Sequence, residues 1–542
     1  MIKKSVLKKC LILFIILLVA FLVRSFQYQD RGIISYDEYG YVSQGHWTAQ
    51  FIVLSLEKVY SVISHPEDAR QILKMIPSEV SSLEGVPSIV SKPLFAYTLG
   101  IFYLLYEDSI PAAILLNSML GAIIILLIYY VGVFLFDERT GFIAAILGIF
   151  NPMLIQYSQQ ATSENLSTAL FLIGFIFLIS DNKFKYQLTG IFYGLAFTAN
   201  LRVLVIEVVT IGTLLLYNFF TRRETFFTAV KNILKSLLMG GIPIIIFEFI
   251  DHMLILAFKN ITRTLYQYNT YFEQLVRHFL LLSENQGVRN WQYILLFFKE
   301  SLSIPITLLA VIGIYYFNKE GLNRKMAVLL AGAVLPLLFF TIVNYKSLRF
   351  YFVVVPFLIL CAAHAINSFS LYVFRWKNWA VFVFIMVSFV AAIPSIYNVM
   401  AVKSATPDAL EFIYDHGGSR YQSNIPFYTF ESERLPRNNV SELFRLCNER
   451  NACYVISYLV HTGLRPEYAR SGFNYNMSLY LQNHCAPEAT FKNKYGEINY
   501  YYFENNGDYS VAGNDAYDYF AEINVYNLRN CALSKNEEKV FG

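Results

Sequence analysis

The chain has 542 residues, of which 56% are hydrophobic and only 15% are charged, and its formal net charge is +4. This apolar excess is beyond that of soluble globular proteins, so we expect a polytopic membrane protein. The small net charge, and the lack of a basic block with interleaved aromatic residues, argue against nucleic acid as a partner.

The first apolar run, Leu11–Val23, comes after a cluster of lysines at Lys3, Lys4, Lys8 and Lys9. No small-residue cleavage site follows it, and many more apolar segments come later. We therefore expect a first transmembrane helix that is retained, not a cleaved signal peptide. The lysines predict that the N-terminus is cytoplasmic.

The first large loop, residues 27–92, is rich in aromatic residues, which argues against disorder, and its length is typical of a functional loop. It continues into an apolar segment, Pro93–Tyr106. This segment is shorter than the roughly 20 residues that a 30 Å hydrocarbon core requires. We expect it to lie on the outer membrane face as an interfacial or re-entrant helix.

Ten further helices are predicted after this segment. With the first helix they make about eleven spans, and this count places the loops that carry Lys183, Arg222, Arg324 and Arg375 in the cytoplasm. Counting Pro93–Tyr106 as a span would place each of these basic loops outside. The ten helices are expected near residues 111–135, 141–158, 164–180, 187–201, 203–220, 236–257, 292–317, 326–344, 350–373 and 380–398.

The composition becomes more polar after the last predicted span. A helical stretch opens at Thr406, and short alternating runs at Ala452–Leu459 and Ile498–Phe503 indicate strands. We expect a transmembrane domain over residues 1–400, followed by a small extracytoplasmic α/β domain over residues 401–542.

Four of the six cysteines lie in this tail, at Cys447, Cys453, Cys485 and Cys531. In a domain outside the membrane they allow up to two disulfides, with three possible pairings. Free thiols are the alternative. Their spacing forms no paired Cys-x-x-Cys knuckles, which argues against a zinc site.

Three polar clusters fall on the predicted outer face. Asp37 and Glu38 come shortly after the first helix, and Lys92 directly precedes the interfacial segment. Lys346 and Arg349 lie in a short outer loop between two late spans. Carboxylates and cations are therefore expected to converge on one side of the membrane.

These clusters resemble a known pattern. Asp37-Glu38, and Lys92-Pro93-Leu94 with Tyr97, are similar to the Asp-Glu and Lys-Pro-Pro-Leu-x-Tyr motifs of GT-C-type glycosyltransferases. That group includes the protein O-mannosyltransferases and the lipid A aminoarabinose transferases. Lys346–Pro356 is similar to the Lys-x-x-Arg-Phe segment of the same group, whereas Leu94 stands where the group has a second proline. Further similar segments are Asn117–Gly121, Phe136–Gly141 and Asn151-Pro152.

The resemblance implies a mainly α fold, a membrane helix bundle of GT-C type with juxtamembrane helices on its outer face. It also implies transfer of a sugar from a polyprenyl-phosphate donor to a hydroxyl acceptor on a lipid, glycan or protein, with inversion. Such a reaction needs a base for the acceptor proton and cations for the departing phosphate. We assign the base to Asp37, beside Glu38, and the phosphate to Lys92 and Arg349. Further candidates for substrate binding are Tyr97, Lys346 and Arg202.

The charged residues among these candidates also have structural alternatives. Asp37 could be a solvated carboxylate that the helix dipole favours in a first turn. Glu38 lies three residues after a serine, which is the spacing of a capping box. Lys92 and Arg349 could anchor the chain at lipid headgroups. The same boundary role is open to Lys346 and Arg202.

Two other functions stay open. A glycan ligase or oligosaccharide transferase would use the same kind of site. Charged residues within spans, such as Glu207 and Glu248, also occur in transporters and lipid flippases. Against a transporter, the hydropathy has no two-fold repeat and no matched pair of broken helices.

No cofactor is predicted with certainty, and the polyprenyl-phosphate sugar is expected as the donor substrate. The sequence has no Walker loop and no His-Glu-x-x-His motif. Asp251 and His252 are two adjacent candidates for metal ligands, but two residues without a third do not make a site. A divalent metal is left open.

Overall fold

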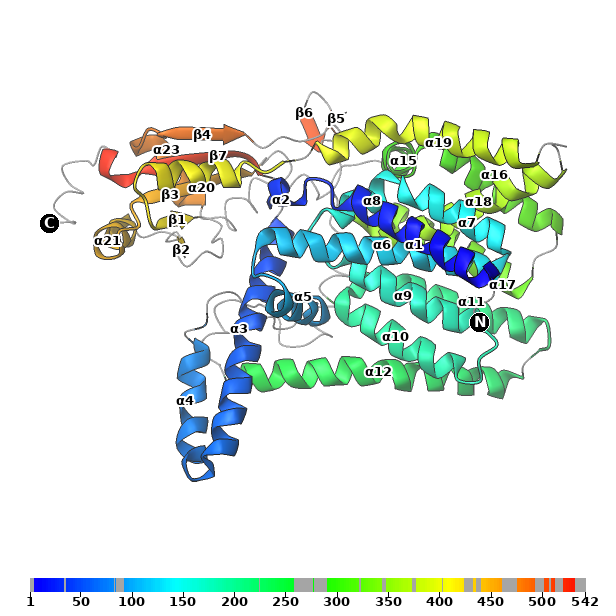
Figure 1. Ribbon diagram of the computed structural model, residues 1–542, viewed down its shortest axis with the longest axis horizontal. Helices are drawn as coiled ribbons and strands as arrows, with labels where there is room; N and C mark the ends of the chain where they lie inside the picture. Colours follow the sequence, from blue (N-terminus) through cyan, green and yellow to red (C-terminus); the bar gives the residue numbers. More distant parts are fainter. Residues whose placement is uncertain are drawn as a thin grey trace.

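The computed structural model consists of a bundle of roughly parallel helices and a sheet with its own helices beyond one end of that bundle (Figure 1). We call the bundle end near the sheet, where α2 (Tyr28–Arg31) and α5 (Pro93–Leu105) lie, the site end. The residues described are 4–33, 36–81, 83, 92–223, 225–257, 276, 290–320, 323–343, 348–372, 377–401, 403–423, 432–434, 440–460, 475–492, 502–505, 508–511 and 520–531.

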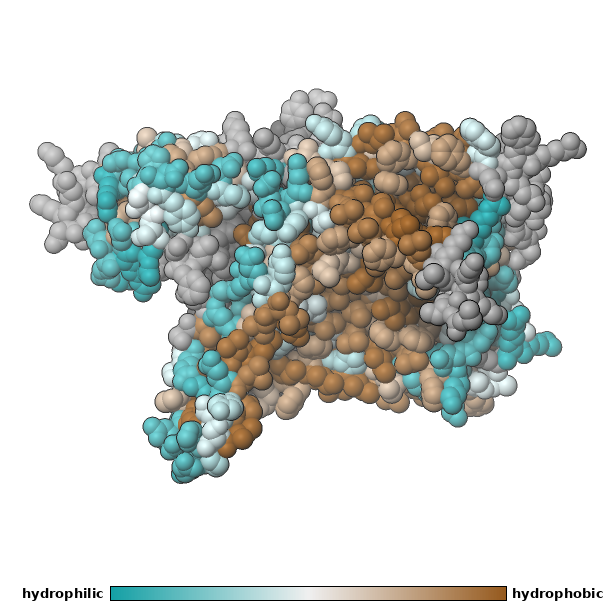
Figure 2. Space-filling model, viewed as in Figure 1, coloured by the Kyte–Doolittle hydropathy of each residue, from teal (hydrophilic) through white to brown (hydrophobic). Residues whose placement is uncertain are grey.

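The helices of the bundle follow the apolar runs of the sequence. Their apolar side chains cover the face of the bundle seen in Figure 2, while hydrophilic residues gather on the sheet domain and at the opposite end of the bundle. The bundle contains α1 (Lys4–Arg24), α6 (Ile110–Leu135), α7 (Glu138–Ile149), α8 (Pro152–Ser158), α9 (Glu164–Ile179), α10 (Lys185–Ala199), α11 (Leu204–Phe220), α12 (Phe226–Ala257), α15 (Asn290–Leu296), α16 (Ile304–Glu320), α17 (Arg324–Ile342), α18 (Val355–Tyr372) and α19 (Lys377–Met400).

Seven helices among the described residues are long and apolar enough to cross a membrane, or up to nine if two bent pairs each count as one span. The eleven predicted spans also include α9 and α10, of 16 and 15 residues, which pack against each other. The polytopic, mainly helical fold is confirmed. The count of eleven stays a prediction.

Two predicted spans are not single helices. Residues 141–158 form α7 and α8, which meet at 62° because Asn151 caps α8 and Pro152 begins it. Residues 292–317 form α15, a π-helical segment η3 (Phe297–Leu302), and α16, with a bend of 102°. Ser303 has a φ of +76° and interrupts the helix there.

Arg24 fixes the end of α1 to the bend between α7 and α8. Its guanidinium is fully buried and donates hydrogen bonds to the carbonyls of Gly148, at 3.0 Å, and Ile149, at 3.3 Å. Carbonyls in the last turn of a helix have no partner within the helix. The arginine therefore satisfies the end of α7 and holds the site end of the bundle together.

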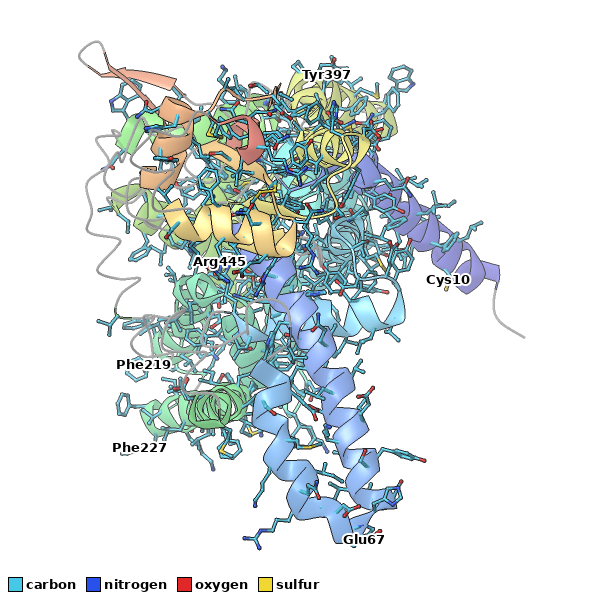
Figure 3. The ribbon with its side chains drawn as sticks, turned by 90° about the vertical axis from the view of Figure 1, so that its left-hand side faces the viewer. Cys10, Glu67, Phe219, Phe227, Tyr397 and Arg445 are labelled. Atoms are coloured by element: carbon cyan, nitrogen blue, oxygen red, sulfur yellow. A yellow bond between two sulfur atoms is a disulfide. The ribbon has the colours of Figure 1, made fainter. Side chains whose placement is uncertain are left out.

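The loop between α1 and α6 is largely helical, as expected for juxtamembrane helices. α3 (Tyr36–Ser64) and α4 (Ala69–Ser81) form a hairpin with Glu67 at its tip (Figure 3), held by an ion pair between Lys58 and Glu79 at 2.6 Å. α5 packs on α3 and runs across the direction of the bundle helices (Figure 1). The short helix predicted at Pro93–Tyr106 is thereby confirmed.

The tail forms the expected small α/β unit. Its main sheet has the strand order β2-β1-β3-β7-β4, in which β1 is parallel to β2 and β3, and β7 is antiparallel to β3 and β4. The elements are α20 (Thr406–Asp415), β1 (Tyr421–Ser423), β2 (Ser432–Arg434), α21 (Val440–Arg450), β3 (Tyr454–Val460), α23 (Tyr475–His484), β4 (Ala489–Lys492), β5 (Tyr502–Asn505), β6 (Asp508–Val511) and β7 (Phe520–Asn527).

The tail packs on the site end through a shared apolar core. Phe95 and Leu99 of α5 belong to the same buried cluster as Ile413 of α20 and Ile456 of β3. The backbone N–H of Ser404 also donates to the carbonyl of Arg31 at 2.6 Å. The two regions therefore share one hydrophobic core at this end.

The four cysteines of the tail form two disulfides, Cys447–Cys453 and Cys485–Cys531, which is one of the three possible pairings. They close loops with sequence separations of 6 and 46. In the chain-entropy treatment the shorter loop stabilises the fold by about 2 kcal/mol and the longer by about 4 kcal/mol.

Removal of the Cys485–Cys531 disulfide is expected to destabilise the tail more than removal of the Cys447–Cys453 disulfide. Thermal unfolding of Cys485→Ser/Cys531→Ser and Cys447→Ser/Cys453→Ser proteins measures the two effects. A larger loss of stability in the Cys447→Ser/Cys453→Ser protein would contradict the loop-length argument.

Candidate active site

Glu38 lies in the first turn of α3 and is fully buried. Its carboxylate accepts hydrogen bonds from the Arg31 guanidinium, at 3.2 Å, and from the backbone N–H of Ala161, at 3.2 Å. Arg31 also donates to the carbonyl of Gln159. The pair therefore ties α2 and α3 to the segment between α8 and α9, which supports a positioning role for Glu38.

Asp37 precedes Glu38 in the same helical turn. Its side chain, like the whole of Ser35, lies outside the described residues, so the predicted capping box lies outside them too. The backbone of Asp37 is nevertheless described, and the buried contacts of its neighbour fix that backbone at the site end. Among the described partners of Glu38 are Arg31 and Ala161, which sequence reasoning missed.

Breaking the buried pair is expected to destabilise the protein. Arg31→Met leaves the Glu38 carboxylate buried without its cation, and such a loss typically costs about 3–5 kcal/mol. The thermal unfolding midpoint in detergent should fall, and the double variant Arg31→Met/Glu38→Leu should recover part of the loss. A wild-type midpoint for Arg31→Met would contradict this role.

Lys92 meets α3 one turn after Asp37. It caps α5 in the left-handed conformation, with a φ of +58°, and is 8% exposed. Its ammonium donates to the hydroxyl of Tyr41 and lies 4.7 Å from the centre of that ring. Since residues four apart share one face of a helix, Tyr41 places the Lys92 cation beside the turn that carries Asp37.

A chain of contacts continues from Tyr41 across the site end. The Ser163 hydroxyl donates to the Tyr41 hydroxyl at 3.5 Å, and the Asn200 amide donates to Ser163 at 3.2 Å and to Glu164 at 3.3 Å. The Glu164 carboxylate in turn lies 3.6 Å from the Arg202 guanidinium. The members of this contact chain are Lys92, Tyr41, Ser163, Asn200, Glu164 and Arg202.

The contact chain ends at the third predicted cluster. The guanidinium of Arg202 lies 4.5 Å from the ring centre of Phe350, which belongs to η4 (Leu348–Val354). Arg349, the preceding residue of η4, is partly buried. The predicted cations Lys92, Arg202 and Arg349 are thus brought to one end of the bundle, while Lys346 lies outside the described residues.

Tyr97 has a described contact on another side of α5. Its ring centre lies 5.8 Å from that of Phe247 in α12. This contact joins α5 to the bundle. The structure therefore supports an anchoring role for Tyr97.

No group of three or more His, Cys, Asp or Glu side chains that could hold a metal ion occurs among the residues that the structure describes. The divalent metal left open by the sequence has no candidate ligand set in that part of the chain.

Comparisons with known proteins identify the fold. The family model for dolichyl-phosphate-mannose-protein mannosyltransferase matches residues 87–247, which include five of the six members of the contact chain. ArnT from Cupriavidus metallidurans bound to undecaprenyl phosphate is similar over 97% of this chain and 99% of its own, with a TM-score of 0.57 and 11% identity. The chain has a GT-C-type membrane glycosyltransferase fold.

Further comparisons give two more similar structures and one negative result. The apo state of the same ArnT gives a TM-score of 0.58 at 10% identity, over 90% of this chain and 97% of its own. AglB from Archaeoglobus fulgidus, in complex with an inhibitory peptide and a dolichol-phosphate, gives a TM-score of 0.51 at 12% identity. This match covers 93% of this chain and 74% of the AglB chain. Curated protein sequences contain no significant match. The GT-C resemblance predicted from sequence motifs is confirmed.

Proposed function

We propose that the protein transfers a sugar from a polyprenyl-phosphate-linked donor to a hydroxyl acceptor, with inversion at the anomeric carbon. The observation that carries this proposal is the contact chain, which runs from Lys92 beside the first turns of α3 to Arg202 beside η4. It contains Lys92, passes through Tyr41 one turn after Asp37 in α3, and ends against Phe350, which is next to Arg349, within a GT-C-type fold. The solved relative bound to undecaprenyl phosphate supports a lipid-linked donor.

The proposed step forms one bond and breaks one. The Asp37 carboxylate takes the proton of the acceptor hydroxyl, and the hydroxyl oxygen attacks the anomeric carbon from the face opposite the phosphate. The bond from that carbon to the phosphate oxygen breaks, and polyprenyl phosphate leaves with the electron pair. Lys92 and Arg349 stabilise its charge, and Glu38 positions the turn that carries Asp37.

Other residues and regions take supporting roles in this proposal. Arg202 stays a candidate for the phosphate, and Lys346 and Tyr97 stay candidates for substrate binding. Residues 1–400 form the catalytic domain and residues 401–542 an extracytoplasmic domain beside it. The acceptor class is left open among lipid, glycan and protein.

The membrane orientation is also proposed. Arg324 pairs with Asp181 at 3.4 Å, and Lys325 donates to the carbonyl of Phe134 at 2.6 Å, so two basic loops meet at the end opposite the site. Basic loops favour the cytoplasm. This supports a cytoplasmic N-terminus and a site on the outer face of the plasma membrane, which labelling of single cysteines in intact cells would test.

A donor assay tests the function directly. Purified protein is given a radiolabelled polyprenyl-phosphate sugar with and without a hydroxyl acceptor, and the lipid products are separated. Acceptor-dependent release of free polyprenyl phosphate is expected. Unaltered donor that only changes leaflet in vesicles would instead identify a flippase.

Oligosaccharide transfer is the second candidate, favoured by the fold likeness to AglB, with a TM-score of 0.51. The same assay separates the two functions when monosaccharide and oligosaccharide donors are compared. Turnover of only the oligosaccharide donor would favour the second function.

A further inference from the structure

A groove lies between α10, α11 and α12, at the lower edge of the bundle in Figure 1. α10 and α12 pack so closely that a side chain at Gly190 or Gly194 would collide with the backbone carbonyls of Ser236 or Gly240. Small residues spaced four apart are typical of such tight packing in membranes. α11 packs mainly on α17 instead, and the space left beside it is about 380 Å³.

The groove opens on the exposed apolar flank of the bundle, and in a membrane such a flank faces the hydrocarbon region. Its rim residues Val208 and Leu237 are 62% and 64% exposed, on the flank of the bundle. Phe219 and Phe227, at neighbouring ends of α11 and α12, also lie on the outside of the bundle (Figure 3). The apolar lining includes Phe197, Leu204, Ile211, Leu215, Ile233 and Ile244.

One acidic side chain lines this apolar groove. Glu207 is only 5% exposed, and its Oε1 atom has no hydrogen-bond partner among the residues that the structure describes. It lies one turn inside α11, which begins at Leu204 near the site end. The candidate active site does not use it.

A buried carboxyl group needs a hydrogen-bond partner, because leaving it unpaired is costly. In its uncharged form a carboxyl group carries one O–H donor. A saturated or isoprenoid chain cannot accept that hydrogen bond, whereas the carbonyl of an acyl ester or amide can. The position also fits, since one helical turn is about 5 Å, and acyl carbonyls lie directly beneath lipid headgroups.

We propose that this groove binds an acyl lipid, and that Glu207 donates a hydrogen bond to an ester or amide carbonyl of that lipid. The occupant comes from the leaflet at the site end, because Glu207 lies near that end of α11. The proposal is independent of the proposed transfer reaction, and lipid binding tests it without any turnover.

The probe is a diacyl phosphatidylglycerol with a photoactivatable group in one chain. Delipidated protein is labelled in detergent, and peptides of α11 and α12 are analysed by mass spectrometry. Unlabelled diacyl phosphatidylglycerol then competes with its diether analogue, which has the same headgroup and chains but no carbonyl. We expect the diester to compete about tenfold better, which corresponds to one hydrogen bond.

Two substitutions at Glu207 test the hydrogen bond. Glu207→Gln keeps an N–H donor of the same size and should retain the preference for the diester. Glu207→Leu keeps the bulk without a donor and should bind both lipids equally. Equal competition in the wild-type protein, or an unchanged preference in Glu207→Leu, would overturn the assignment.

Gly241 allows the groove to be filled without disturbing its walls. A Cβ added at Gly241 has no atom within 4 Å, unlike one added at Gly190 or Gly194. Gly241→Leu should therefore fold normally, by its unfolding midpoint, and lose the labelling. Leu238→Phe adds bulk on the lipid-facing side of α12, outside the groove, and should leave labelling unchanged.

Two results of this second comparison would count against the proposal. Labelling that persists in folded Gly241→Leu protein would place the lipid elsewhere. Displacement of the probe by polyprenyl phosphate at lower concentration than by the diester would identify the groove as a site for an isoprenoid chain.

Discussion

Asp37→Asn protein is expected to lose sugar transfer by about 100- to 10,000-fold, the range that a positioned general base contributes. The amide has the size of the carboxylate but cannot take the proton of the acceptor hydroxyl. The loss should appear in kcat, measured as acceptor-dependent release of polyprenyl phosphate. Binding of the donor should change little, because the proposed phosphate ligands are untouched.

The matched control is Asp30→Asn. Asp30 is an exposed acid of α2 at the same end of the bundle, and it has no proposed role in the reaction. Its variant should transfer sugar at the wild-type rate. Full activity in folded Asp37→Asn protein would refute the assignment of the base, whereas loss of activity in both variants would indicate a general effect of charge at this end.

Glu38 shows which contacts of a site residue can be predicted from the sequence and which cannot. Its spacing suggested a local cap with Ser35, which lies outside the described residues, and the structure shows a pair with Arg31, seven residues away in the chain. The turn between them depends on Gly32, with a φ of +64°, where an added Cβ would lie 2.8 Å from the Cβ of Ser404. That long-range constraint is absent from any local pattern.

Lengths of apolar runs predicted most of the bundle well, because each helix must be apolar over the hydrocarbon thickness. The bends were missed. Asn151 followed by Pro152 is a helix start that local chemistry could have indicated. The helix breaks at Ser303, whose φ is positive. Serine does not favour a positive φ, so the sequence does not indicate this break.

The contact chain could be predicted only in part. Lys92 and Arg202 were found because charged residues at a membrane boundary are conspicuous. Ser163 and Asn200, which connect them through Tyr41 and Glu164, are ordinary polar residues on separate segments. Their role follows from packing across the end of the bundle, and it has no signature in sequence spacing.

Replacing Lys92 should give the second large effect. Lys92→Met keeps the length of the side chain and removes the cation, and we expect transfer to fall by about 100- to 1,000-fold, as when one group that stabilises developing charge is removed. Unlike Asp37→Asn, this variant should also bind polyprenyl phosphate more weakly. Lys92→Arg should restore part of the affinity, because it restores the charge but not the point geometry of an ammonium.

Two further variants separate charge at the phosphate from packing at α3. Tyr41→Phe removes the hydroxyl that accepts from Lys92 but keeps the ring 4.7 Å from its ammonium, so a smaller loss of about tenfold or less is expected. Lys58→Met removes a cation from the α3–α4 hairpin, where Lys58 pairs with Glu79, and should leave donor binding unchanged. If Lys92→Met binds polyprenyl phosphate as tightly as the wild type, Lys92 supports the helix junction and the phosphate is held elsewhere. The same conclusion would follow if Lys92→Arg protein had the low affinity and low rate of Lys92→Met protein. A cation at this position would then have no part in binding.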